Sequence, residues 1–240
     1  MGRALKGRGC LMPSIKGVIQ REGEEEEVLD VELERDVLEQ NRRLADENNK
    51  LLKEKGVMAI DVLGSVGSGK TSLIERLVDA LKPSYKVAVI EGDVATTIDS
   101  ERVASHGVSV VQVNTGKECH LDALLIRKAI EKLDLSSIDI LFIENVGNLI
   151  CPADFPLGSD LRIVIVSVTE GPHMVVKHPF IFAEADVVVI NKLDLADLMG
   201  VDVDRIEEDV RRISPRPKVV RTSCRTGEGV QEVIRALGLR

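Results

Sequence analysis

The stretch GSVGSGKT, residues 64–71, fits the pattern G-x-x-x-x-G-K-[ST] at every fixed position. It follows an apolar, β-branched run and precedes the helical sequence TSLIERLVDALK, the context in which this pattern forms a phosphate-binding loop. The glycines let backbone N–H groups surround phosphate oxygens beside the positive end of a helix, and Lys70 is expected to reach the β- and γ-phosphates. We therefore predict a nucleoside triphosphate site contacted by Ser65, Val66, Gly67, Ser68, Gly69, Lys70, Thr71 and Ser72.

On both sides of this loop, the chain alternates β-branched runs with helical stretches. We expect strands at 57–64, 86–93, 108–113, 138–146, 161–168, 185–192 and 218–223. Nearly continuous apolar strands separated by helices are typical of a parallel sheet that is covered on both faces. The predicted fold class is therefore α/β, a doubly wound, largely parallel sheet with P-loop NTPase architecture and an N-terminal helical extension.

The composition argues against several classes of function. A net charge of -8 does not suit nucleic-acid binding, which needs clustered Lys and Arg. No apolar run approaches the roughly 20 residues needed to span a bilayer, so we expect no membrane association. The chain has 4 cysteines and no apolar segment typical of a secretory signal, so we expect a reducing compartment and a cytoplasmic location.

The sequence NKLD, residues 191–194, follows a strand at the sheet edge where open α/β folds bind ligands. A carboxylate at Asp194 can accept hydrogen bonds from the N1–H and the exocyclic amine of guanine, whereas adenine offers no such pair of donors. A later loop, SCRTGEG, is similar to the segment with which GTPases close over the base. We predict GTP as the substrate, with contacts from Asn191, Lys192, Asp194, Ser223, Cys224 and Arg225.

Acidic residues at the carboxyl ends of strands are candidates for a magnesium site. We expect Thr71, Asp93 in IEGD and Glu144 in FIENVG to ligate Mg²⁺, with Asp99 as a third acid for the metal or for orienting water. Glu144 begins an E-x-x-G sequence, so Gly147 is expected to sense the γ-phosphate. The catalytic candidates are Lys70, Thr71, Asp93, Asp99 and Glu144.

The N-terminal region divides into two parts. Residues 1–27 carry basic residues, glycines and an acidic run, so we expect a flexible tail. Residues 28–55 contain apolar doublets at a seven-residue spacing, which predicts an N-terminal helix that either packs on its own domain or pairs with another chain. The predicted P-loop GTPase domain comprises residues 56–240.

Cysteine and histidine are adjacent in GKECHLDA, residues 116–123. Cys119 and His120 follow the third predicted strand and Cys151 follows the fourth, so the three side chains can converge from two loops. Thiolate and imidazole are ligands of both Zn²⁺ and Ni²⁺. Three protein ligands leave one coordination position open, which suits a site that receives and releases metal. Packing of ordinary buried side chains stays open as an alternative.

These segments make the chain resemble the hydrogenase nickel-incorporation GTPases of the HypB family, from about residue 28 to the C-terminus. The combination of GKECHLDA with ENVGNLICPADFPLG is specific, because the related urease nickel GTPases carry a Cys-Pro-His triplet instead. The resemblance implies a slow GTPase that forms a homodimer when GTP binds, with Cys119, His120 and Cys151 holding Ni²⁺ or Zn²⁺ at the dimer interface. It also implies that Lys177 contacts the guanine bound by the partner subunit.

By the same resemblance, the protein assists nickel insertion into the large subunit of nickel–iron hydrogenase, together with a partner nickel metallochaperone. The N-terminus lacks the Cys-rich or His-rich nickel motifs of some family members and has only the isolated Cys10. Three alternatives remain: a metallochaperone GTPase for a urease or cobalamin enzyme, a small-molecule kinase, and a nucleotide-binding interaction module. A kinase would leave NKLD unexplained, and the sequence has no arginine cluster typical of a kinase lid.

Overall fold

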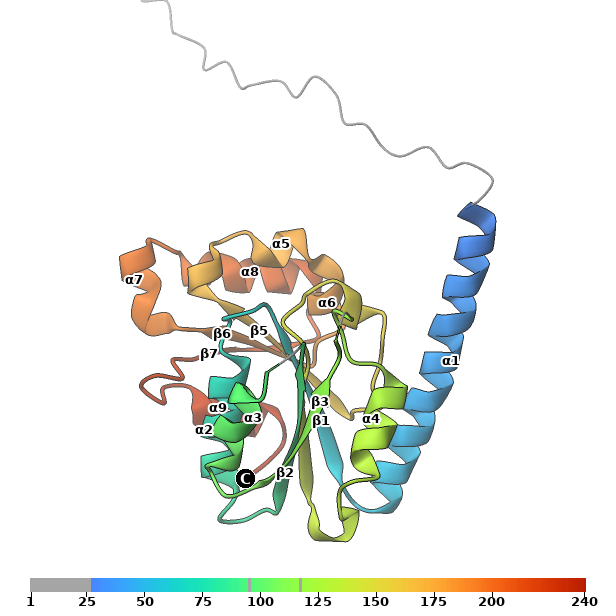
Figure 1. Ribbon diagram of the computed structural model, residues 1–240. Helices are drawn as coiled ribbons and strands as arrows, with labels where there is room; N and C mark the ends of the chain where they lie inside the picture. Colours follow the sequence, from blue (N-terminus) through green and yellow to red (C-terminus); the bar gives the residue numbers. More distant parts are fainter. Residues whose placement is uncertain (1–26, 95, 117) are drawn as a thin grey trace, which may run out of the picture. The chain divides into compact units, whose positions relative to one another are not determined.

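The computed structural model describes residues 27–94, 96–116 and 118–240, and of residues 27–34 the backbone alone. Its centre is a 7-stranded parallel sheet in the order β3-β2-β4-β1-β5-β6-β7 (Figure 1). The strands are β1 Met58–Gly64, β2 Val87–Asp93, β3 Ser109–Asn114, β4 Ile140–Glu144, β5 Leu161–Ser167, β6 Val187–Asn191 and β7 Lys218–Arg221. Each predicted strand is confirmed.

Helices connect the strands and cover both faces of the sheet (Figure 1). They are α1 Glu27–Glu54, α2 Lys70–Leu81, α3 Ile98–Ala104, α4 Ala123–Ile130, α5 Met174–Lys177, α6 Pro179–Ala183, α7 Ala196–Met199, α8 Val203–Ile213 and α9 Val230–Ala236. Short 3₁₀ helices are η1 Leu135–Ser137, η2 Cys151–Ala153, η3 Val168–Glu170 and η4 Leu193–Leu195. Among the described residues, no helix combines the length and the apolar character that crossing a bilayer requires.

Strand side chains alternate between two apolar cores, as expected for strands buried on both faces. Ile60, Val62 and Phe142 pack with α2, α3 and α9 on one face. Ala59 and Ile143 point to the opposite face, where α4 and the end of α1 pack, and α5, α6 and α8 cover the remainder of that face. The doubly wound α/β fold is therefore confirmed.

The helix predicted for residues 28–55 is present as α1. The compact unit that contains the sheet spans Val37–Arg240 and so includes the C-terminal part of this helix. Ala45 and Leu52 from the predicted apolar doublets are buried, and Asn41 and Asn48 are buried beside them. The division into parts at residues 27 and 55 stays a prediction, and the tail predicted before Glu27 lies outside the described residues.

One acidic side chain is enclosed in the sheet. Asp61 of β1 is fully buried, on the face opposite α2, and its Oδ2 lies 3.6 Å from Nε of Arg162. Burial raises the pKa of the Asp61 carboxyl to about 6, although the Arg162 guanidinium and the amide of Asn145 oppose the rise. The ionised carboxylate therefore lowers the stability of the folded state.

Asp61→Asn should remove this pH-dependent cost. A carboxyl with a raised folded-state pKa stabilises the fold when protonated, and that contribution is lost as pH rises from 3.8 to about 6. We expect the free energy of unfolding of Asp61→Asn, relative to wild type, to increase by roughly 2–3 kcal/mol between pH 4 and pH 7. Denaturant unfolding across this pH range measures the difference. A difference that stays constant with pH would contradict the prediction.

Candidate functional site

Two glycines set the backbone of the phosphate loop. Gly67 and Gly69 have φ angles of 76° and 103°, in the region that disfavours residues with a Cβ. A Cβ on Gly69 would also lie 2.3 Å from Nδ2 of Asn191, so the position lacks space for one. Because α2 begins at Lys70, the N–H groups at its start face the loop. The segment has the geometry of an anion-binding site.

A cavity of about 410 Å³ adjoins this loop and the ends of β2 and β4. Of the predicted phosphate and magnesium residues, it is lined by Val66, Gly67, Gly69, Lys70, Thr71, Ser72, Asp93, Asp99, Glu144 and Gly147. Two residues of the predicted set face elsewhere. Ser65 donates from Oγ to Glu170 Oε2 at 2.7 Å, and the Ser68 side chain is buried.

Two buried carboxylates belong to this cavity. Glu91 of β2 and Glu144 of β4 are direct partners in the strand register. Thr71 Oγ1 donates to Glu144 Oε1 at 2.9 Å, and Lys70 Nζ lies 3.9 Å from the same oxygen. Burial and the Glu144 carboxylate raise the pKa of Glu91, and burial raises that of Glu144. Within the described residues, Oε2 of each has no hydrogen-bond partner.

These groups fit a magnesium ion. Mg²⁺ selects hard oxygen ligands, and a divalent cation at this position would favour the ionised forms of two carboxyl groups whose pKa values burial raises. Thr71, Glu144 and Glu91 are the oxygen donors in the deepest position. The sequence analysis did not identify Glu91, although an acidic residue inside the apolar strand KVAVIEGD is a detectable feature, because charged side chains are rarely buried without a partner.

Asp93 and Asp99 line the same cavity, but each is bonded to residues close to it in the chain. Asp93 accepts hydrogen bonds from the backbone of Val94 at 2.7 Å and of Thr96 at 2.9 Å. It also accepts one from the Thr96 hydroxyl, and these bonds lower the pKa of Asp93. Asp99 pairs with Arg102 at 2.7 Å. Their roles as metal ligand or water-orienting group stay predictions.

Gly147 brings the segment after β4 against the phosphate loop. A Cβ at this position would lie 2.4 Å from Cγ2 and 2.9 Å from the backbone N of Val66. The Gly147 backbone thus lies against both the backbone and the side chain of Val66, and position 147 has no room for a larger residue. The segment after β4 is thus packed directly against the phosphate loop, and the role of Gly147 as a γ-phosphate sensor stays a prediction.

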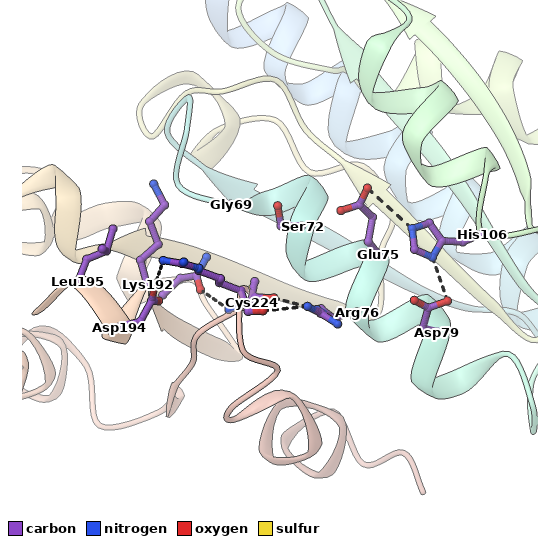
Figure 2. A pocket seen from close by; sticks show the side chains of 12 residues that line it. Gly69, Ser72, Glu75, Arg76, Asp79, His106, Lys192, Asp194, Leu195 and Cys224 are labelled. Atoms are coloured by element: carbon purple, nitrogen blue, oxygen red, sulfur yellow. Dashed lines mark hydrogen bonds and ion pairs between the residues drawn. The ribbon is translucent and has the colours of Figure 1, made fainter.

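A second cavity, of about 550 Å³, lies between α2, the NKLD segment and the loop after β7 (Figure 2). Asn191 donates from Nδ2 to the carbonyl of Ser68 at 3.0 Å and accepts from the backbone N of Cys224 at 3.2 Å. Asp194 accepts from Ser223 Oγ at 2.6 Å and lies 3.7 Å from Arg225. The predicted base contacts therefore meet at one cavity.

Two residues absent from the predictions complete this cavity. Arg76 of α2 donates to the carbonyls of Cys224 at 2.8 Å and Arg225 at 3.0 Å, which fixes the loop after β7 against α2. His106 lines the opposite end of the cavity, 2.9 Å from Asp79 (Figure 2). The hydrogen bonds from Arg76 to the backbone were not predictable. Every residue has a backbone carbonyl, so the sequence does not show which carbonyls accept side-chain hydrogen bonds.

Lys192 has φ of 64°, the one positive φ of a non-glycine residue among those the structure describes. This conformation turns its side chain back to the phosphate loop, where Nζ donates to the carbonyl of Gly67 at 2.6 Å and to Thr169 Oγ1 at 3.1 Å. The NKLD segment and the phosphate loop are thus connected through the ammonium group of Lys192. A strained residue at such a junction is typical of functional sites.

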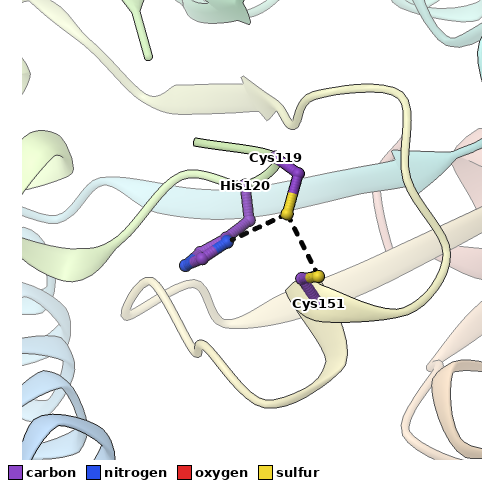
Figure 3. Close-up of side chains that lie close together, drawn as sticks. All are labelled: Cys119, His120 and Cys151. Carbon is purple, nitrogen blue, oxygen red and sulfur yellow. Dashed lines mark hydrogen bonds between the residues drawn. The ribbon is translucent and has the colours of Figure 1, made fainter. Parts of the chain in front are cut away.

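Cys119, His120 and Cys151 do converge from two loops, as Figure 3 shows. Cys119 Sγ lies 3.1 Å from Cys151 Sγ and 3.8 Å from His120 Nδ1. The three ligand atoms lie within 4.8 Å of one another. Hydrogen bonding to Cys151 raises the pKa of Cys119, so metal binding there releases a proton. The donor set fits Ni²⁺ or Zn²⁺.

Cys119 and His120 lie in the loop between β3 and α4, and α4 begins at Ala123, after both metal candidates. Asp122 sets this start, because its side chain accepts a hydrogen bond from the backbone N of Leu125 at 2.7 Å. Lys177 is exposed on α5 and lines neither nucleotide cavity, so its predicted guanine contact across a dimer stays a prediction.

Residues 58–221 match the model of the family described as CobW/HypB/UreG, nucleotide-binding domain. The chain belongs to this family. It is 54% identical over 204 residues to the probable hydrogenase maturation factor HypB of Methanocaldococcus jannaschii, covering 85% of this chain and 92% of the relative. That identity and coverage place it with the HypB hydrogenase maturation factors.

Two solved HypB structures have the same fold. The one from Archaeoglobus fulgidus is 46% identical with a TM-score of 0.78, covering 83% of this chain and 97% of the other. The one from Helicobacter pylori, in complex with nickel, is 35% identical with a TM-score of 0.78, covering 82% and 93%. The HypB family resemblance is therefore confirmed.

Asp194→Asn should change the base preference from guanine to xanthine. An amide offers one donor and one acceptor, which suits the C2 carbonyl and N1–H of xanthine, whereas it leaves one guanine donor without an acceptor. We expect GTP affinity to fall by roughly 10- to 100-fold and XTP affinity to rise comparably, since one mismatched polar contact costs about 1–3 kcal/mol. Competition binding with both nucleotides measures this. An unchanged GTP preference would exclude Asp194 as the base-reading group.

Proposed function

We propose that this protein is a GTP-hydrolysing metallochaperone that binds nickel and assists its insertion into the large subunit of nickel–iron hydrogenase. The observation that carries this proposal is the convergence of Cys119, His120 and Cys151 at the sheet edge that also holds the nucleotide cavities. The nickel-bound Helicobacter pylori relative and the maturation-factor names of the relatives support it. Delivery would involve a partner nickel metallochaperone and the hydrogenase subunit.

Each part of the nucleotide site has a role in this proposal. Asp194 reads guanine, the phosphate loop and Lys70 hold the phosphates, and Thr71 with Glu144 and Glu91 would hold Mg²⁺. When bound, Mg²⁺ would offset charge on the β- and γ-phosphates. Water then hydrolyses GTP to GDP and phosphate. Lys70 Nζ lies 3.9 Å from Glu144 Oε1, so the chain itself supplies one cation at the proposed phosphate site.

A chain of hydrogen bonds supports coupling between nucleotide and metal. Glu144, which bonds Thr71, is followed by Asn145, whose Oδ1 accepts from the backbone N of Leu121 at 3.1 Å. Asn148 donates from Nδ2 to the carbonyl of Cys119 at 3.2 Å. The segment that senses phosphate thus bonds directly to the segment that carries the first two metal ligands. Loss of the γ-phosphate would alter the geometry around the metal.

We also propose that GTP binding brings two copies together. Exposed apolar side chains gather near Cys151, with Ile150 at 64%, Val176 at 56% and Phe180 at 80% exposure, and Lys177 lies among them. Burying them against a second copy would remove apolar surface from water. Light scattering with GDP and with a non-hydrolysable GTP analogue tests this step. An unchanged mass would contradict it.

Cys119→Ala and Cys151→Ala should each remove most of the nickel binding. Loss of an outer-shell partner typically weakens metal affinity by roughly 10- to 100-fold, and loss of a ligand atom should cost more than that. Titration with Ni²⁺ measures the affinity. Cys10→Ala, at a cysteine that is not one of the three proposed ligands, is the matched control and should bind like wild type. Unchanged nickel binding in both site variants would refute the metallochaperone proposal.

Asn145→Ala should uncouple the two sites. In wild type we expect nickel affinities with GDP and with a GTP analogue to differ by about 5-fold or more, the usual size of coupling between sites. In Asn145→Ala that ratio should fall to about 1–2, because the bond to Leu121 is lost. Asn114→Ala, at the exposed end of β3, is the control and should retain the ratio. Retention of the ratio in Asn145→Ala would contradict this route of coupling.

A further inference from the structure

Two asparagines of α1 lie in its buried, otherwise apolar stripe. Asn41 and Asn48 are 6% and 0% exposed, and they alternate with Ala45 and Leu52, which are also buried. A buried carboxamide costs free energy unless its donor and acceptor groups are both hydrogen-bonded. Their bonds therefore explain why polar residues are placed at these positions.

Both asparagines join the two segments that carry the metal ligands. Asn41 accepts at Oδ1 from the backbone N of Ala123 at 2.8 Å and donates from Nδ2 to the carbonyl of Pro156 at 2.9 Å. Asn48 donates from Nδ2 to the carbonyl of Ala123 at 2.8 Å and to that of Leu157 at 3.3 Å. Each side chain is thus a bridge between the start of α4 and the segment after η2.

The bridged positions are close to the ligands in the chain. Ala123 comes three residues after His120, and Pro156 and Leu157 follow the 3₁₀ helix that begins at Cys151. The two segments also touch directly, because the rings of His120 and Phe155 lie 4.0 Å apart between centroids. The spacing of the ligand atoms therefore depends on how these two segments are held together.

We propose that Asn41 and Asn48 are positioning residues that set the spacing of the Cys119–His120 and Cys151 segments for metal binding. The proposal rests on the metal site of the proposed function and assigns a further task to α1. Asn41 satisfies an N–H of one segment and a C=O of the other at once, whereas Nδ2 of Asn48 donates to one C=O of each segment and its Oδ1 accepts from Arg127 at 3.3 Å. An aliphatic residue in the stripe would leave these backbone groups unpaired.

The same helix supplies a matched control. Asn49 donates to the carbonyl of Gly158 at 3.0 Å and to Asp160 at 3.2 Å, so it contacts the second segment only. Asn49→Ala removes a similar number of side-chain hydrogen bonds between α1 and the domain without removing a bridge. It separates the docking of the helix from the spacing of the ligands.

The test compares Asn41→Ala, Asn48→Ala and Asn49→Ala with wild type and with Cys119→Ala. The measurements are Ni²⁺ affinity, the thiolate-to-nickel charge-transfer absorption, GDP affinity and thermal unfolding. We expect the two bridging variants to bind Ni²⁺ roughly 10- to 100-fold more weakly, with a shifted absorption band. GDP affinity should stay within about twofold of wild type, and Asn49→Ala should bind nickel as wild type does. Should Asn48→Ala not fold, Asn41→Ala and Asn48→Gln give the same comparison.

Two results would overturn the proposal. One is wild-type nickel affinity and absorption in both bridging variants. The other is an equal loss in Asn49→Ala, which would assign the effect to helix docking in general. Failure of the underlying function looks different, because Cys119→Ala would then leave nickel binding unchanged, whatever the asparagine variants do.

Discussion

The adjacent buried carboxylates of Glu91 and Glu144 impose the constraint on which the site is built. Parallel pairing of β2 with β4 places them in register, so two buried carboxyl groups lie side by side, Glu144 at the end of β4 and Glu91 two residues before the end of β2. Such a pair is tolerated only with compensating cations and hydrogen bonds, which fixes Lys70 and Thr71 of the phosphate loop beside them. The same strand ends then lead into the loops that hold Asp93 on one side and Gly147 on the other.

The alternation of side chains along β4 connects the two sites. Phe142 and Glu144 face the side of α2 and the phosphates, whereas Ile143 faces the side of α4 and α1. Asn145, the next residue, continues this alternation and bonds to the segment of Cys119. Glu144 and Asn145 both line the cavity beside the phosphate loop, and Asn145 also bonds the backbone of the segment that carries Cys119 and His120. No long relay is needed, because one peptide unit separates the two side chains.

Much of this was predictable from the sequence, for identifiable physical reasons. The phosphate loop and the strands have strong local sequence patterns. Because the carboxyl ends of parallel strands meet at one edge of the sheet, Cys119 and Cys151 were expected to lie close together at that edge. Glu91 was not predicted as a magnesium ligand because Asp93, two residues later, is the acidic residue at the end of the strand. The structure shows Asp93 bonded to Thr96 instead. Asn41 and Asn48 were not predicted because the seven-residue spacing was read from apolar residues only. Their hydrogen-bond partners are backbone groups far along the chain, which the sequence does not show.

Polar side chains from two elements contact the segments that carry Cys119, His120 and Cys151. Asn145 and Asn148 belong to the segment that contacts the phosphate loop through Gly147, whereas Asn41 and Asn48 belong to a helix that packs in the core through Leu52. If the helix and the β4 segment both moved when the nucleotide changes, the metal ligands would shift as one body and keep their geometry. In the proposed coupling, α1 holds one end of both segments, so a movement of the β4 segment relative to the helix would change the distances between Cys119, His120 and Cys151. A fixed helix is thus what would convert phosphate sensing into a change of metal coordination.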